Sequence, residues 1–336
     1  MVNRLIRYET GANGIVDITV DTGKVLVGDT FPPTTSQDMY GVACDASGFL
    51  YVSDSERGAI YKVKDGGEIS LFAGTPNEEG YVNAGGTDAR FSSPLGMAVD
   101  KSGNIYVADI GNGAIRKIDQ GARVSTLADG FVGPWDVAVA PNGNVIVADT
   151  ADNKVYSVEP NGTIHFIAGD DADDVCGVDV DGAKIKGNEA KFNAPATVAV
   201  DPSGNIYVGD TGNYKIKKID TDGWVTRFCG TGSEGNVNGD ADTSEFTNIF
   251  QLRSNKTGEL YMVDKVARGV TRLKRIDGNG NTATAAYIDE DALGFAIAPN
   301  GQIFVAESAG QIGNVSSASS ESSQGSSDSS GSSPGP

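Results

Sequence analysis

Carboxylates recur at regular places along this chain, and carboxylates in sets can bind cations or serve as general acids and bases. Six of them close six copies of one short phrase: Asp54, Asp109, Asp149, Asp210, Asp264 and Glu307. One carboxylate per copy, always in the same position, indicates a part of the repeated scaffold rather than a single site. We therefore expect these side chains to accept backbone N–H groups in the turn that follows each phrase.

A second set of oxygen-bearing side chains lies in one acidic stretch. Its members are Glu234, Asn236, Asn238, Asp240, Asp242 and Glu245, at nearly the spacing of the twelve-residue calcium loop, with Glu in place of the first Asp. Residues 79–83 repeat the start of this pattern, and the predicted flanking elements are strands rather than helices. A further stretch, residues 170–181, holds six aspartates. We predict no cofactor, with calcium as the alternative to a solvated acidic loop.

The other chemistry-bearing residues give little support for catalysis. The chain has one histidine, His165, in the predicted strand 163–167, which excludes a zinc site built from several histidines. A Ser-His-Asp triad would depend on that same strand residue. Cys44, Cys176 and Cys229 have no paired spacing and predict neither disulfides nor zinc. We predict no enzyme, with a carboxylate- or calcium-dependent hydrolase or lyase as the alternative.

The repeated phrase is the element that must position every candidate site. It occupies residues 41–54, 96–109, 136–149, 197–210, 251–264 and 294–307. Each copy predicts a short apolar strand, a tight turn and a half-buried strand. A charged strand such as 114–118 and a fourth strand such as 124–127 follow. Four antiparallel strands per unit, repeated around an axis, predict an all-β propeller.

The phrase Gly-x-Ala-Val-Asp-x-Ser-Gly-Asn-Ile-Tyr-Val-Ala-Asp, followed by Gly-Asn-x-x-Ile-x-Lys-Ile, resembles the NHL repeat. Segments between copies, such as 73–94 with its Ala-Arg-Phe-Ser-Ser-Pro ending, resemble the linkers of bacterial and plant members. The resemblance covers residue 1 to about residue 310. NHL domains are commonly six-bladed β-propellers, so it implies six blades of four antiparallel strands.

The two ends of the chain are expected to share one blade. Residues 14–27 match third and fourth strands, and the last phrase supplies first and second strands, so together they close the ring. Residues 4–8 also resemble a second strand, which this scheme does not place. We expect the propeller to span residues 1–315. Residues 316–336 are rich in Ser and Gly and predict a flexible tail or linker, or a segment held by another chain.

One face of such a propeller receives three long linkers, residues 73–95, 168–196 and 229–250, and the opposite face receives tight turns. Long loops on a rigid scaffold commonly carry binding residues. The candidates on this face come from second-to-third-strand turns and from linkers: Glu56, Arg57, Tyr81, Asn112, Trp135, Asp152, Asn153, Asn213, Tyr214 and Arg268.

Composition and charge narrow the function. The net charge of −19 favours a soluble protein and opposes binding to nucleic acid. No signal peptide or membrane-spanning segment is visible, so we expect cytoplasmic synthesis. We predict a non-catalytic interaction or scaffold propeller that binds another macromolecule through its loop-rich face or outer wall, such as a structural component of a phage or virion surface. A propeller hydrolase or lyase and a sugar- or peptide-binding sensor are the alternatives.

Overall fold

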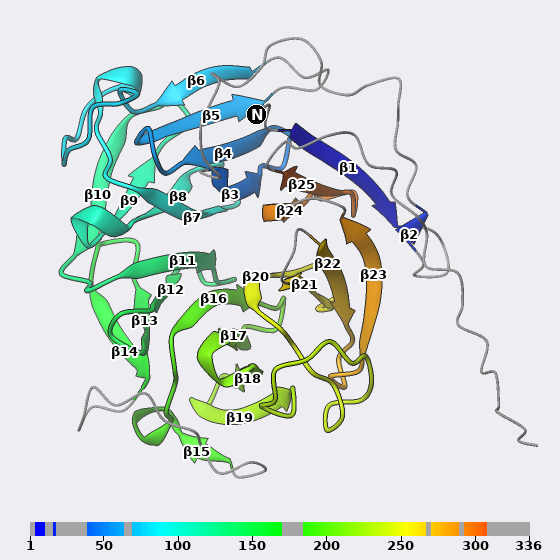
Figure 1. Cartoon of the computed structure of the whole chain (residues 1–336). Helices are drawn as coiled ribbons and strands as arrows, with labels where there is room; N and C mark the ends of the chain where they lie inside the picture. The colour runs from blue at the N-terminus through cyan, green and yellow to red at the C-terminus, as the bar shows by residue number, and fades with distance from the viewer. Residues whose placement is uncertain are drawn as a thin grey trace, which may run out of the picture.

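The computed structural model describes residues 4–10, 16–17, 39–63, 69–169, 184–266, 270–288 and 292–307. The strands in this part of the chain form antiparallel sheets arranged around an axis (Figure 1). The predicted all-β propeller of four-stranded antiparallel blades is confirmed.

Five blades are each built from one continuous stretch of chain, with the first strand at the axis. Blade 1 contains β3 (Met39–Cys44), β4 (Leu50–Asp54), β5 (Ala59–Val63) and β6 (Ile69–Ala73). Blade 2 contains β7 (Pro94–Val99), β8 (Ile105–Asp109), β9 (Ala114–Ile118) and β10 (Val124–Asp129). Blade 3 contains β11 (Pro134–Val139), β12 (Val145–Asp149), β13 (Lys154–Val158) and β14 (Ile164–Ala168).

Blade 4 contains β16 (Pro195–Val200), β17 (Ile206–Asp210), β18 (Lys215–Ile219) and β19 (Trp224–Cys229), with β15 (Ile185–Lys186) added outside β19. Blade 5 contains β20 (Ile249–Ser254), β21 (Leu260–Val266), β22 (Val270–Ile276) and β23 (Thr282–Ile288). Short 3-10 helices in linkers and turns are η1 (Gly86–Asp88), η2 (Ile110–Asn112), η3 (Gly187–Glu189) and η4 (Thr211–Asn213).

A split sheet joins the two ends of the chain in the order β24 (Ala292–Ile297), β25 (Ile303–Glu307), β1 (Arg4–Thr10) and β2 (Val16–Asp17). Its inner strand β24 packs between β20 and β3, so the ring of inner strands is continuous. The predicted assignment of the third strand to residue 14 onward is wrong. The seven-residue β1 takes that place because it is long enough to pair with the whole of β25. Residues 18–27 lie outside the described residues.

Apolar side chains of each blade pack against the next blade rather than within one sheet. The cluster between blades 1 and 2 includes Ile60, Met97 and Val107, and the linker residue Phe91 lies fully buried in it. Phe192 and Phe246 occupy the same place in the clusters before blades 4 and 5. Each long linker is therefore part of the core.

Tight turns join the first and second strands of each blade. In blade 2 the Asp100 carboxylate accepts the backbone N–H of Ser102 (2.8 Å) and of Asn104 (2.9 Å). Gly103 takes φ +77°, a conformation that residues with a Cβ rarely adopt. The Asp-x-Ser-Gly-Asn part of the phrase is thus the sequence of one turn.

The turn carboxylate Asp100 makes part of the stability dependent on pH. Burial alone would raise its pKa, but hydrogen bonds from Asn104, Tyr106 and Ser102 hold the pKa below its usual 3.8. A carboxyl whose folded-state pKa is depressed contributes stability that is present above about pH 4 and lost as the pH falls through the folded-state pKa. We expect Asp100→Asn to lower the urea midpoint at neutral pH and to matter less at about pH 3. An equal effect at both pH values would contradict this role.

Candidate functional site

The first residues of the phrases join the blades around the axis. In blade 3, Asp136 accepts a hydrogen bond from the Thr197 hydroxyl of blade 4 (2.7 Å). Thr197 in turn accepts the Leu252 N–H of blade 5 (2.8 Å), and Gln251 accepts the Phe295 N–H of the split sheet. Where the phrase begins with glycine, there is no room for a side chain: a Cβ at Gly96 would lie 2.6 Å from the Asp136 Cα.

A buried ion pair crosses the channel. The Arg253 guanidinium donates to both carboxylate oxygens of Asp136, at 2.8 and 3.1 Å. The two side chains are 15% and 2% exposed, and they come from blades 5 and 3, which are not neighbours. Both residues depart from the phrase, because Arg253 stands where the other five copies have Ala, and Asp136 stands where three have Gly.

Three aromatic side chains cluster at the starts of inner strands, at the end where the linkers enter. The Tyr40 ring lies 5.5 Å from Trp135 and 4.8 Å from Phe250, and the Trp135 indole donates to the Tyr40 hydroxyl. They occupy β-bulges at the starts of β3, β11 and β20. Burial strongly raises the pKa of Tyr40, which keeps its hydroxyl neutral.

Each long linker is held by a buried cation on the third strand of the blade that follows. In blade 2, Arg116 lies 2.7 Å from Asp109 and donates to the backbone carbonyls of Arg90 and Val82, both at 3.0 Å. Its guanidinium also lies 5.0 Å from the centre of the Phe91 ring. The equivalent sets are Lys217 with Asp210 and Phe192, and Lys274 with Asp264 and Phe246.

The phrase-closing carboxylates contact backbone N–H groups, but mostly not in the turn that was predicted. Asp149 accepts from Val132 (2.9 Å) and Gly133 (2.7 Å), which precede the first strand of the same blade. Asp109, Asp210 and Asp264 bond equivalent linker N–H groups, whereas Asp54 accepts from Arg57 in the following turn. The reason is that the first two strands are antiparallel, so the end of the second lies beside the start of the first. Burial raises the pKa of Asp54, Asp109, Asp149 and Asp210. The side chain of Glu307 lies outside the described residues.

Several candidate binding residues form hydrogen bonds within the scaffold. Asn112 donates to the Gly80 carbonyl and to Asp109, and Asn213 donates to Asp210 (all 2.8 Å). The Asn153 side-chain oxygen accepts the Ala194 N–H (2.8 Å). The sequence analysis overlooked that the Asn of the Gly-Asn pair follows the repeated phrase at a fixed distance. Such a repeated position indicates a structural residue rather than a binding residue.

The other candidates are spread around the ring rather than gathered in one site. Trp135 lies in the aromatic cluster, and Asp152 accepts the hydroxyl of Tyr156 (2.5 Å). Tyr214 reaches Glu234 (3.5 Å), and Arg57 is half-buried. Glu56 and Tyr81 are exposed. Arg268 lies outside the described residues.

The side chains of the acidic linker, the candidates for the calcium alternative, contact different partners. Asp242 forms an ion pair with Arg227, Asp240 accepts the Thr243 hydroxyl (2.7 Å), and the Asn238 amide donates to Thr284 (2.9 Å). With its amide group flipped, Asn236 accepts hydrogen bonds from Arg272 (2.8 and 3.0 Å). Among the described residues, no group of three or more His, Cys, Asp or Glu side chains could hold a metal ion. Residues 170–181 lie outside the described residues.

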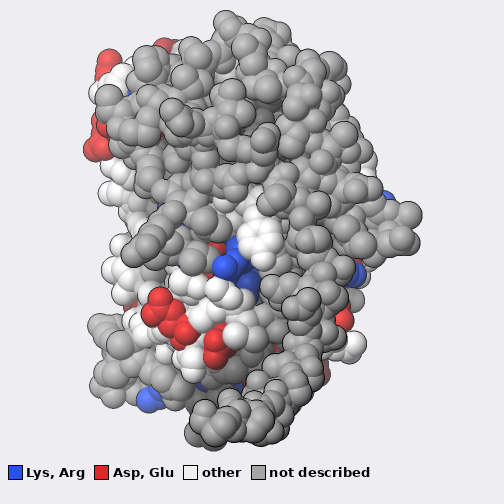
Figure 2. All heavy atoms as spheres, turned by 45° about the vertical axis from the view of Figure 1, so that its right-hand side comes forward, with Lys and Arg blue, Asp and Glu red and all other residues white. Residues whose placement is uncertain are grey.

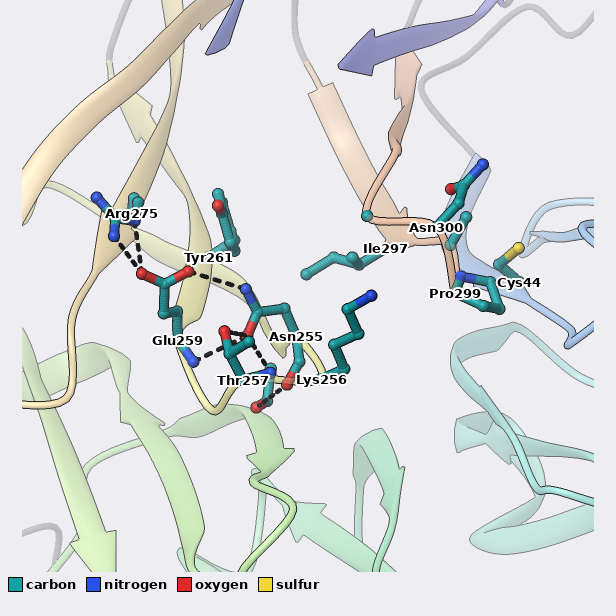
Figure 3. Close-up of a pocket in the computed structure, with 13 residues that line it drawn as sticks. Cys44, Asn255, Lys256, Thr257, Glu259, Tyr261, Arg275, Ile297, Pro299 and Asn300 are labelled. Carbon is teal, nitrogen blue, oxygen red and sulfur yellow. Dashed lines mark hydrogen bonds and ion pairs between the residues drawn. The ribbon is translucent and has the colours of Figure 1, made fainter. Parts of the chain in front are cut away.

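A cavity of about 370 Å³ opens on the face that carries the tight turns (Figure 3). Its walls come from the turn 255–258 of blade 5, the turn 298–301 of the split sheet and Cys44 of blade 1. Figure 3 shows Glu259 and Arg275 on one side and Ile297 and Pro299 on the other. The sequence prediction placed only tight turns on this face and missed the cavity.

The cavity contains an ionised carboxylate and a neutral thiol. Glu259 accepts from Arg275 Nε and from Asn255 Nδ2, both at 3.0 Å. Burial alone would raise the pKa of Glu259, but these hydrogen bonds hold it below its usual range, so the carboxylate stays ionised. Burial raises the pKa of the Cys44 thiol to about 12, which keeps it neutral and a poor nucleophile. Lys256 is exposed at the rim.

Charges of both signs lie close together on the surface. Figure 2 shows basic side chains near the centre of one face with acidic side chains beside them. The described part of this face therefore lacks the extended basic stripe that nucleic-acid binding requires. No helix among the described residues is long and apolar enough to cross a membrane.

Comparison with known proteins gives matches to parts of the chain. Residues 129–220 match the teneurin NHL domain, and residues 91–118 match the NHL repeat. SUPPRESSOR OF QUENCHING 1, a chloroplastic protein of Arabidopsis thaliana, is 26% identical over 287 residues, which cover 77% of this chain and 23% of the plant protein. Teneurin-3 of Mus musculus is 30% identical over 112 residues, which cover 28% of this chain and 4% of teneurin-3. The chain spans less than a quarter of either relative.

Solved structures share the fold at low sequence identity. A gluconolactonase from Xanthomonas campestris is 14% identical, with a TM-score of 0.56 over 81% of this chain and 86% of that chain. Virginiamycin B lyase from Staphylococcus aureus is 11% identical, with a TM-score of 0.51 over 81% of this chain and 95% of that chain. At such identities the likeness concerns the fold alone.

Proposed function

Because the chain is an NHL-repeat β-propeller, we propose that it is a non-catalytic binding module that holds a protein partner on its linker-bearing face. The observation that carries this proposal is a set of exposed apolar side chains on the linkers that enter blades 2 and 3: Tyr81, Val82 and Val132, which are 46%, 38% and 64% exposed. Exposed aromatic residues beside apolar ones are typical anchors of protein interfaces.

The scaffold positions Tyr81 in advance. Its hydroxyl donates to Asp129 (3.1 Å), and its ring lies 4.9 Å from the buried Arg116 guanidinium. A side chain fixed before binding loses less conformational entropy on association.

We expect a photo-crosslinking residue at Val132, introduced in the native host, to form an adduct with one defined protein. Tyr81→Ala should abolish the adduct, because it removes the anchor. The matched control is the same crosslinker at Lys101, an exposed turn residue on the opposite face, which should give no adduct. Equal adducts at Val132 and Lys101, or none at Val132, would contradict the proposal.

We further propose that the split sheet is the sixth blade and that the propeller spans residues 1–315. Residues 316–336, which lie outside the described residues, would then be a separate tail.

A narrower hypothesis is that the protein is incorporated into a large assembly, such as a virion surface. Light scattering on the native protein tests it, since a strictly monomeric, partner-free particle would count against assembly.

A propeller hydrolase or lyase is the second candidate, and the cavity at Glu259 is the observation that favours it. Gluconolactonase and virginiamycin B lyase show that this fold can carry enzymes. Turnover of a lactone by the purified protein, lost in Glu259→Gln, would replace the first proposal.

A further inference from the structure

The outer edges of three blades are covered in the same way by the chain itself. In blade 2, Val124 at the start of β10 donates its N–H to the linker residue Ala84 (2.8 Å). In blade 5, Thr282 at the start of β23 donates to Gly239 (2.7 Å). In blade 4, β15 pairs with β19 and places Ile185 opposite Val225. In each blade, the residue or strand that pairs with the outer edge belongs to the long linker that enters that blade.

Ile164 is the equivalent residue in blade 3, and no segment among the described residues pairs with it from outside. It pairs with Val158 on β13 as Val124 pairs with Ile118 on β9. The linker that enters blade 3 is only residues 130–133, and no described strand pairs with the outer edge of β14. Ile164 is consequently 39% exposed, whereas Val124 and Val225 are each 1% exposed.

The backbone of β14 is therefore ready to accept another strand. N–H groups along an antiparallel strand alternate between its two neighbours, so the Ile164 N–H points away from β13, as the Val124 N–H does. An exposed edge of this kind is a template for an added strand.

The charges beside the edge indicate the chemistry of the occupant. In blade 4 the covering segment contributes Lys184, which lies 2.8 Å from Asp220 at the start of the β18–β19 turn. Glu159 starts the equivalent β13–β14 turn, where its N–H donates to the Thr163 carbonyl (2.9 Å), as that of Asp220 does to Trp224. The Glu159 carboxylate is 39% exposed and bonds His165 (2.8 Å) and Asn161 (3.2 Å).

We propose that the outer edge of β14 binds an extended, basic segment of a partner protein, which pairs with Ile164 and places a lysine or arginine beside Glu159. A second copy of the chain is a poorer occupant, because each copy carries a net charge of −19. The surface belongs to the outer wall and is independent of the exposed apolar set at Tyr81.

The test uses the full-length protein and a synthetic peptide of residues 184–192, whose first residues form the natural cover of blade 4. Calorimetric titration should show saturable binding, and hydrogen exchange should show new protection in β14. Ile164→Pro removes the outward N–H without removing a bond to β13, and it should weaken binding at least about tenfold. The matched control Ile164→Val keeps that N–H and should bind as the parent does. The same peptide with K184E and K186E should bind more weakly.

Absence of binding, equal affinity of Ile164→Pro and Ile164→Val, or protection of β19 in place of β14 would each overturn the proposal. Should Ile164→Pro fail to fold, as circular dichroism would show, Glu159→Gln takes its place, and an unchanged affinity for the basic peptide would overturn the proposal equally. A concentration-dependent dimer that Ile164→Pro dissociates would assign the edge to a second copy instead. None of these results bears on the crosslink at Val132.

Discussion

Arg253→Ala is expected to lower the free energy of unfolding by about 3–5 kcal/mol. The Asp136 carboxylate is 2% exposed and receives two hydrogen bonds from Arg253. Without the guanidinium, this charge stays buried with the Thr197 hydroxyl and the Val198 N–H as its neighbours. Urea unfolding followed by circular dichroism measures the change.

The double variant Asp136→Gly with Arg253→Ala provides the decisive control. It returns both positions to residues that other phrases carry, such as Gly96 and Ala98, and it removes both charges together. Removing one partner of a buried ion pair leaves an unpaired buried charge, which removing both partners avoids. We expect the double variant to be more stable than Arg253→Ala alone. Additive losses in the double-mutant cycle would show that the two side chains act independently.

This ion pair illustrates what the sequence could predict and what it could not. Strands and turns follow from local signals, because each phrase contains its own apolar alternation and its own Asx turn. Arg253 and Asp136 were visible as departures from the phrase, yet they are 117 residues apart. Only the closing of the ring brings them together across the channel.

Two other features depended on comparing neighbouring blades in space. The exposed edge at Ile164 follows from the shortness of the linker 130–133. The length of this linker can be read from the sequence. Its consequence could not be predicted, because only the structure shows that the longer linkers cover the outer strands of other blades. The cavity beside Glu259 combines turns from different blades with Cys44. Its local signal is that Glu259 stands where three sister phrases have Asn. Linker side chains such as Asp242 could not be placed from spacing, because their partners lie on strands elsewhere in the chain.

Arg116→Met is the second variant with a large expected effect, a loss of about 3–5 kcal/mol in unfolding free energy. Arg116 and Asp109 are both fully buried, and methionine keeps the apolar volume while removing the charge. Asp109 would be left with the Ser92 N–H and the Asn112 amide. The carbonyls of Arg90 and Val82 would lose their donor. Lys117→Met, one residue along β9 and partly exposed, should stay within about 0.5 kcal/mol of the parent.

The same substitution tests whether the long linkers, and not only the blades, depend on their cation. Blade 3 has Tyr156 at the equivalent position and is entered by the short linker 130–133. Among the blades whose entering linker is described, a buried cation is therefore found where that linker is long. Arg116→Met should therefore expose residues 73–93 to protease before the rest of the propeller unfolds, and urea unfolding should no longer be a single transition. A single transition with an intact linker would mean that Phe91 alone holds it. Since Arg116 also lies under the Tyr81 ring, a loosened linker should weaken the Val132 crosslink as well.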